Sequence, residues 1–182
     1  MQTSSTGVSR TRQVVAAVIG NALEWYDFIV YGFLASIIAR QFFPSEDEYA
    51  SLLMALATFG VGFFMRPVGG ILLGMYSDRK GRKAAMQMII RLMTVSIALI
   101  AFAPNYAAIG MGAPLLIVVA RMLQGFATGG EYASATAFLV ESAPAHRKGL
   151  YGSWQLVGQC LAVFAGAGMV ALFAPLLTPA AL

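Results

Sequence analysis

Five long apolar segments, separated by short polar or charged connections, constrain this chain more than any other feature. They cover about residues 14–38, 52–75, 84–103, 114–140 and 150–173. The hydrocarbon core of a bilayer is roughly 30 Å thick, and a helix of about 20 apolar residues crosses it. Lipid offers no partner to bare backbone groups, and the alternation typical of barrel strands is absent from this sequence. We therefore expect each segment to be a transmembrane helix.

Composition supports an all-α membrane protein and leaves no room for a soluble domain. Only 11% of the 182 residues are charged and the mean hydropathy is +0.74, whereas a soluble domain carries about 25% charged residues. The basic residues cluster at the ends of the apolar segments instead of forming one continuous surface. That distribution favours the lipid bilayer as a partner and argues against nucleic acid.

The basic residues also predict the direction of the helices. Eight Lys and Arg residues lie at the N-terminus and in the connections after the second and fourth segments, against one in the other two connections. The positive-inside rule then places the N-terminus in the cytoplasm, in a multi-pass protein of the plasma (inner) membrane. Five helices would leave the C-terminus outside, so we expect a truncated chain or one piece of a longer protein.

The connection between the second and third segments is more specific than a basic loop needs to be. It contains an aspartate where topology alone favours no acidic residue. Its order is glycine, three residues, aspartate, basic, any residue, glycine, basic, basic, which resembles the signature loop of the major facilitator superfamily. The resemblance implies a conformational gating loop. Its residues in this sequence are Gly74, Asp78, Arg79, Gly81, Arg82 and Lys83.

Three further stretches narrow the resemblance. They cover residues 20–28 (GNALEWYDF), 63–70 (FFMRPVGG) and 120–132 (ARMLQGFATGGEY). Together they resemble the metabolite:proton symporter branch of the superfamily, which includes carriers of citrate, of 2-oxoglutarate and of proline and betaine. The resemblance implies a major facilitator type helical bundle of twelve helices in two halves, with alternating access. Five of the twelve helices are present here, so the missing second half of the carrier is a further expected partner.

Two carboxylates interrupt the first segment near its middle. Glu24 and Asp27 are three residues apart and share one helix face, which Tyr31 continues. Burial favours the protonated form of a carboxylate and a nearby cation favours the ionised form, so a carboxylate whose partner comes and goes can load and release a proton. We predict Asp27 as the first proton-coupling group and Glu24 as the second. The alternative is a packing pair that neighbouring hydroxyls or an Arg satisfy.

Arg121, in the fourth segment, is the expected partner of these carboxylates. Gln124, Thr128 and Tyr132 follow at offsets of three, seven and eleven and extend the same polar stripe. A polar stripe in a transmembrane helix faces the bundle interior or a water-filled cavity. The resemblance places this Arg in the proton-coupling region. The alternatives are a planar grip on a substrate carboxylate and a structural role.

Other polar residues inside the segments mark a predicted substrate pathway. Arg66 could attract an anionic substrate or pair with Glu24, and Glu131 could serve the pathway or the structure of a gate. Gln155 and Gln159 lie four residues apart on one stripe, where amides could contact a substrate carboxylate or bridge helices. The predicted pathway comprises Arg66, Tyr31, Gln124, Glu131, Gln155 and Gln159.

These patterns together predict a secondary active transporter that couples protons to the uptake of a small organic acid, such as citrate or 2-oxoglutarate. Proton-coupled uptake of proline or betaine, and a non-transporting membrane fragment, are the alternatives. The sequence contains no metal-ligand cluster, nucleophile–base pair or phosphate-binding glycine loop. We therefore expect no enzyme activity, no metal and no cofactor other than the coupling proton.

Overall fold

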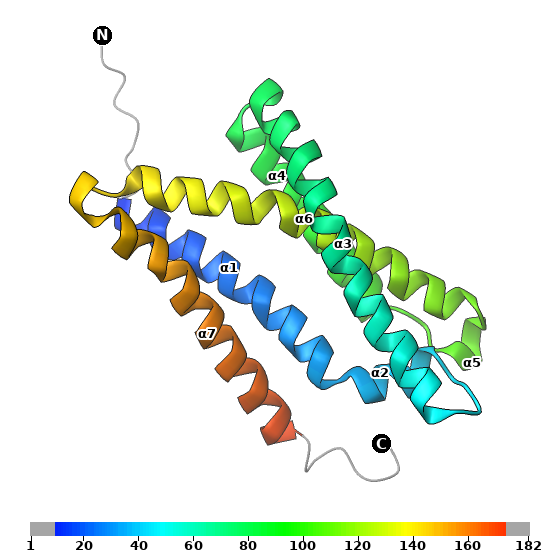
Figure 1. Ribbon diagram of the computed structural model, residues 1–182. Helices are drawn as coiled ribbons and strands as arrows, with labels where there is room; N and C mark the ends of the chain where they lie inside the picture. The colour runs from blue at the N-terminus through cyan, green and yellow to red at the C-terminus, as the bar shows by residue number, and fades with distance from the viewer. Residues whose placement is uncertain (1–9, 174–182) are drawn as a thin grey trace.

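All the elements that the structure describes are helices (Figure 1). The structure is a computed structural model, which describes the backbone of residues 10–173. It also describes their side chains, apart from those of residues 10–13, 16–17, 82–83, 133–134, 137–138 and 142. The elements are α1 (Arg10–Phe33), α2 (Ala35–Phe42), α3 (Glu48–Lys80), α4 (Arg82–Ala101), α5 (Tyr106–Ile109), α6 (Gly112–Ser142), the 3-10 turn η1 (Ala145–Arg147) and α7 (Lys148–Phe173).

Helices lie over all five predicted segments, but the first segment is broken. Among the described residues, four helices are long and apolar enough to cross a membrane, or five if α1 and α2 count as one bent span. These two helices meet at 67° around Leu34, whereas the apolar pattern predicted one helix over 14–38. Gly32 and Ser36 flank the break, and small residues of this kind are common where a helix kinks.

Beyond the bend, α2 is anchored to α3. The Ser51 hydroxyl, on α3, donates to Ala39 O of α2 at 3.1 Å and also to Phe43 O at the end of that helix. Ala39 O also accepts the Phe43 backbone N–H at 2.8 Å, so Phe43 O, just past the end of α2, is the free carbonyl that these Ser51 bonds satisfy. Since they come from another helix, the apolar pattern of the segment could not reveal them.

α3 continues through most of the predicted gating loop. It ends at Lys80, and only Gly81 separates it from α4, so the connection predicted over 76–83 is reduced to one residue. Gly81 has a φ of 88°, a left-handed conformation that glycine adopts without steric cost. Arg79 and Lys80 lie in the last turn of α3, where positive charge complements the helix dipole. The loop prediction was wrong because a basic sequence at a membrane surface also suits the end of a long helix.

α3 and α6 pack with their backbones in contact along a row of glycines. A Cβ atom on Gly69 would overlap the backbone of Phe126, and one on Gly125 would overlap the backbone of Gly62. A Cβ atom on Gly129 would overlap the backbone of Arg66. Small residues permit this close approach between membrane helices. We call Gly62, Gly69, Gly125 and Gly129 the glycine seam.

Not every glycine of these helices lies in the seam. A Cβ atom on Gly74 would meet nothing within 4 Å in the described chain, whereas Gly125 and Gly129, four residues apart, both pack against the backbone of α3. The sequence does not tell which face of a helix meets a neighbour, so it could not identify the seam.

α6 connects two groups of helices (Figure 1). α3 and α4 pack against α6, while α1 runs beside α7. Small residues again allow the second contact: a Cβ atom on Gly158 of α7 would lie 3.1 Å from Val18 O of α1. Since α6 also contacts α1 and α7, polar residues of α6 can reach residues of α1.

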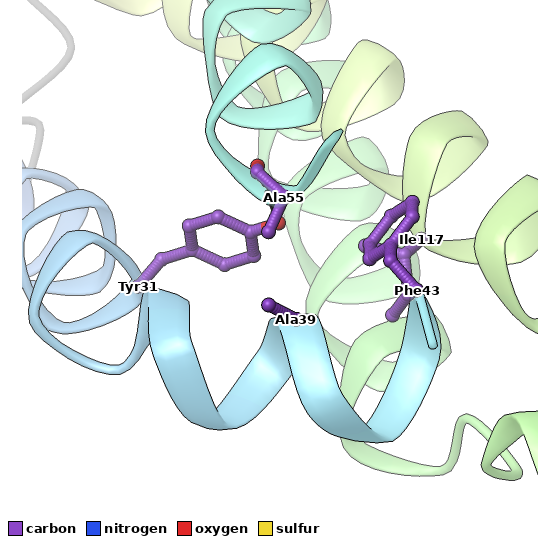
Figure 2. Packing of buried hydrophobic residues seen from close by; sticks show 5 residues of the cluster. All are labelled: Tyr31, Ala39, Phe43, Ala55 and Ile117. Atoms are coloured by element: carbon purple, nitrogen blue, oxygen red, sulfur yellow. Dashed lines mark hydrogen bonds between the residues drawn. The ribbon is translucent and has the colours of Figure 1, made fainter. Parts of the chain in front are cut away.

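A buried apolar cluster lies where α1, α2, α3 and α6 meet (Figure 2). It consists of Tyr31, Ala39, Phe43, Ala55 and Ile117. The Tyr31 hydroxyl donates to Ala55 O at 3.2 Å, which satisfies the one polar group in the cluster. By contrast, many large apolar side chains point outward, including Phe64 (82% exposed) and Phe164 (77% exposed). Apolar surface of this extent is rare on soluble monomers and is expected where lipid contacts a protein.

Candidate functional site: the polar interface of α1 and α6

Polar side chains of α1 and α6 meet inside the bundle. They are Asn21 and Glu24 on α1, and Arg121, Gln124 and Thr128 on α6, each at most 3% exposed. Tyr132, predicted to extend the α6 stripe, is 47% exposed, so the stripe leaves the interior after Thr128. Polar and ionisable groups inside a membrane protein are costly, and they mark functional sites by default.

Asp27, Arg121 and Gln124 form one hydrogen-bonded group, which we call the Asp27 site. Arg121 Nη1 donates to Asp27 Oδ2 at 3.2 Å and to Gln124 Oε1 at 2.5 Å. Gln124 Nε2 donates in turn to Asp27 Oδ2. The sequence predicted that Arg121 would meet a carboxylate of the first segment, and the structure brings Asp27 to it. The Arg121 side chain is 2% exposed and that of Asp27 is 32% exposed, so within these helices only the carboxylate is partly uncovered.

Aromatic rings hold the Arg121 guanidinium from its other side. Arg121 Cζ lies 3.8 Å from the centroid of the Tyr31 ring and 5.7 Å from that of Phe28. Tyr31 is itself fixed, because its ring stacks on Phe59 and its hydroxyl is bonded to α3. A cation over an aromatic face is stabilised by the ring quadrupole. Arg121 therefore has contacts that do not depend on the charge of Asp27.

Arg66 lies among aromatic rings and not in an ion pair. Its Cζ is 4.3 Å from the centroid of Phe63, 4.5 Å from that of Phe28 and 5.3 Å from that of Trp25. Its Nε and Nη2 atoms are buried and have no hydrogen-bond partner among the described residues. The predicted alternative of an ion pair with Glu24 is not formed within that part of the chain. A guanidinium with free donors suits an anionic ligand, and that role stays a prediction.

Glu24 lies one helical turn from Asp27 and forms a separate group. Both of its carboxylate oxygens are buried, and no described residue donates a hydrogen bond to them. The charges of Glu131 and Arg66 act electrostatically on it, and the Thr128 hydroxyl is a hydrogen-bonding group beside it. Glu131 approaches α1 at Gly20, where a Cβ atom would lie 3.4 Å from Glu131 Oε1. We call the group formed by Asn21, Glu24, Thr128 and Glu131 the Glu24 site.

Comparison with known proteins assigns the chain to a family. The family model described as "Sugar (and other) transporter" matches residues 13–176. The chain belongs to this transporter family. It is therefore a multi-pass membrane protein of the major facilitator superfamily. No solved structure gives a significant match.

Several curated relatives of this transporter family member are carriers of small organic molecules. The proline/betaine transporter of Salmonella typhimurium is 42% identical over 161 residues, covering 88% of this chain and 32% of that protein. The citrate-proton symporter of Klebsiella pneumoniae is 40% identical over 179 residues, covering 98% of this chain and 40% of that protein. The shikimate transporter of Escherichia coli is 39% identical, covering 94% of this chain and 40% of that protein. The chain thus spans about a third to two fifths of the length of these relatives.

In this member of the transporter family, the amides of α7 lie apart from the Asp27 site. Gln155 is buried, and its Oε1 accepts a hydrogen bond of 2.8 Å from the Thr136 hydroxyl of α6. Gln159 is half-buried. No hydrogen bond in the described part of the chain joins either amide to Asp27 or Arg121. Gln155 therefore bridges two helices here, which was the alternative to its predicted substrate contact.

The residues of the signature loop lie at the junction of α3 and α4. Gly74, Asp78 and Arg79 belong to α3, and Asp78 and Arg79 are exposed. The side chains of Arg82 and Lys83 lie outside the described residues. The gating role of this group stays a prediction.

The sequence patterns did not identify three residues of the interface as functional. Asn21 belongs to one of the stretches that carry the family resemblance, yet no role was assigned to it. As a polar residue in an apolar segment it carried a usable signal. Trp25 and Phe28 carried none, because aromatic residues are ordinary in membrane helices and their approach to Arg66 depends on how α1 and α3 pack.

Proposed function

We propose that the protein containing this chain is a secondary active transporter that couples proton entry to uptake of a small carboxylate-bearing solute. The observation that carries this proposal is the Asp27 site. A buried arginine is paired there with a partly exposed carboxylate. The proposed location is the plasma (inner) membrane with the N-terminus in the cytoplasm, as the distribution of Lys and Arg favours.

The Asp27 site can couple a proton to an anion. A proton that binds Asp27 neutralises the carboxylate and ends its attraction for Arg121. The guanidinium stays in place, because Gln124 Oε1 and the Tyr31 ring still contact it. Its positive charge is then available to a substrate carboxylate. Protonation of Asp27 frees Arg121 for a substrate carboxylate, and a substrate carboxylate bound to Arg121 favours protonated Asp27. The proton and the substrate therefore increase each other's affinity by the same factor.

The proposed substrate is a small organic acid with two or three carboxylates, such as citrate or 2-oxoglutarate. A second cation supports this choice, because Arg66 has buried donors without partners among the described residues. One relative is named as a citrate-proton symporter. We also propose that helices outside these 182 residues complete the substrate site, which in transporters of this kind lies near the membrane midplane between two halves.

A zwitterionic solute such as proline or betaine is the second candidate. Relatives at equal similarity are named as proline/betaine transporters. A zwitterion also carries a carboxylate, so the Asp27 site would act in the same way. The rings of Trp25, Phe28 and Phe63, which surround Arg66, are groups that attract an organic cation.

Uptake of labelled citrate, 2-oxoglutarate and betaine into vesicles containing the carrier tests the proposal, with and without an imposed proton gradient. We expect gradient-dependent accumulation of one class of solute. Asp27→Asn should abolish accumulation and leave exchange across the membrane intact, because only the first requires a proton cycle. Glu46→Gln, in an exposed connection, is the matched control. Undiminished accumulation by Asp27→Asn would refute the assignment of Asp27.

A further inference from the structure

Glu24 is the most enclosed acidic side chain in the described part of the chain. It is 3% exposed, and neither carboxylate oxygen accepts a hydrogen bond there. An ionised carboxylate is strongly disfavoured in such surroundings unless a partner neutralises it. The Asp27 site does not supply that partner, because Arg121 already pairs with Asp27.

Asn21 provides a second, independent observation beside it. It lies three residues before Glu24, on the same face of α1, and is 1% exposed. Both Asn21 Nδ2 and Asn21 Oδ1 are buried without a hydrogen-bond partner among the described residues. Buried amides are nearly always hydrogen-bonded. An amide with a free donor and a free acceptor next to a carboxylate indicates an occupant able to exchange a proton, such as a carboxylic acid group.

Glu131 brings a second carboxylate to the same place. The charged groups that face Glu24 from other helices are Glu131 of α6 and Arg66 of α3. Arg66 stacks on aromatic rings and forms no ion pair with either glutamate within the described chain. Two carboxylates therefore lie close to a single cation that pairs with neither of them.

We propose that Glu24 and Glu131 form a second proton-binding site, in which the two carboxylates share one proton. Two carboxylates that share a site cannot both ionise without mutual repulsion, and one proton between them removes it. The Asn21 amide and the Thr128 hydroxyl line the site and can hydrogen-bond the protonated pair. A metal cation would instead add positive charge beside Arg66.

The role of this site in transport rests on the proposed function. Glu24 precedes Asp27 on α1, and Glu131 follows Arg121 on α6. Both glutamates therefore lie nearer than the Asp27 site to the N-terminal end of α1 and the C-terminal end of α6, and basic residues occur at both of those ends. When a proton leaves Asp27, the carboxylate regains its ion pair with Arg121. The Glu24–Glu131 pair takes up that proton as it releases the proton it holds toward the basic end of the bundle, so the pair carries one proton before and after each transfer. The Glu24 site thus gives the proton an intermediate position between Asp27 and the basic end of the bundle.

Infrared spectroscopy of the 182-residue chain in lipid bilayers tests this proposal without requiring transport. The measured quantity is the signal of protonated carboxyl groups at neutral pH. We expect Glu24→Gln to remove a signal that the unmodified chain shows. Glu131→Gln should lower the affinity of the site for a proton about tenfold, seen as a shift of about one pH unit in the midpoint of the signal, since removing a neighbouring like charge has about that effect. Glu46→Gln should leave the signal unchanged.

Asp27→Asn and Glu131→Gln keep the outcomes distinct. Asp27→Asn should retain the signal, so a failure of the proposed function and a failure of this inference give different results. Glu131→Gln tests the pair even where Glu24→Gln fails to insert, because Glu131 is only partly buried. A signal that neither glutamate substitution alters would overturn the proposal. A signal that sodium ions abolish at constant pH would assign the site to a metal cation and would also overturn it.

Discussion

Two faces of α6 make different kinds of contact with the neighbouring helices. Toward α3 it presents the glycine seam, where side chains are absent and the two backbones touch. Toward α1 it presents Arg121, Gln124 and Thr128, which meet polar groups of the first helix. The seam has no side chain that could take another rotamer, whereas the polar interface depends on charges that a proton can change. The contrast indicates that the contact between α3 and α6 is rigid, and we propose that proton binding acts instead at the contact between α1 and α6.

Breaking the glycine seam should have the largest effect. Gly125→Ala places a Cβ atom on the backbone of Gly62, and relieving this overlap should cost about 3 kcal/mol of unfolding free energy or more. Gly60→Ala is the control, because a Cβ atom there meets nothing within 4 Å. Unfolding of the purified chain in detergent, followed by circular dichroism, measures both. Equal stability of the two variants would contradict the backbone contact.

Breaking the polar interface should cost less. Arg121→Gln removes the partner of Asp27, and we expect a loss of about 2 kcal/mol, below the value for a wholly buried pair because Asp27 is partly exposed. The control is Arg40→Gln. The Arg40–Glu48 pair is shorter, at 2.6 Å, but its side chains are 52% and 73% exposed.

Exposed pairs of this kind contribute at most about 1 kcal/mol. The same unfolding assay should therefore rank Arg121→Gln well above Arg40→Gln. The reverse order would mean that contact distance outweighs burial in this chain.

Substitutions of Tyr31 should give the smallest loss of stability, and they separate the contribution of its hydroxyl from that of its ring. Tyr31→Phe keeps the ring beneath Arg121 and loses the hydrogen bond to Ala55 O, which should cost about 1 kcal/mol. Tyr31→Leu also loses the aromatic face and should cost about 1 kcal/mol more. If both variants have the same stability, the ring does not hold the guanidinium.

The sequence predicted those parts of the molecule that depend on one helix at a time. Long apolar segments located the helices, and charges inside them pointed to Asp27 and Arg121. The bend at Leu34 was missed, and the bonds that anchor α2 after the bend come from another helix, at Ser51 of α3. The environment of Arg66 was missed for a similar reason, since the rings of Trp25 and Phe28 come from α1. Periodicity shows which residues share a face, but not which helix that face meets.

The glycine seam also has a genetic consequence. Every missense change at a glycine codon introduces a Cβ atom, so no single substitution can preserve the contacts of Gly69, Gly125 and Gly129 with the opposite backbone. Gly60 and Gly74, which have open space around them, are free of that restriction. In a library of random variants selected for folded protein, the seam positions should therefore remain glycine while their neighbours diversify, and the contact between α3 and α6 could be mapped from the surviving sequences alone.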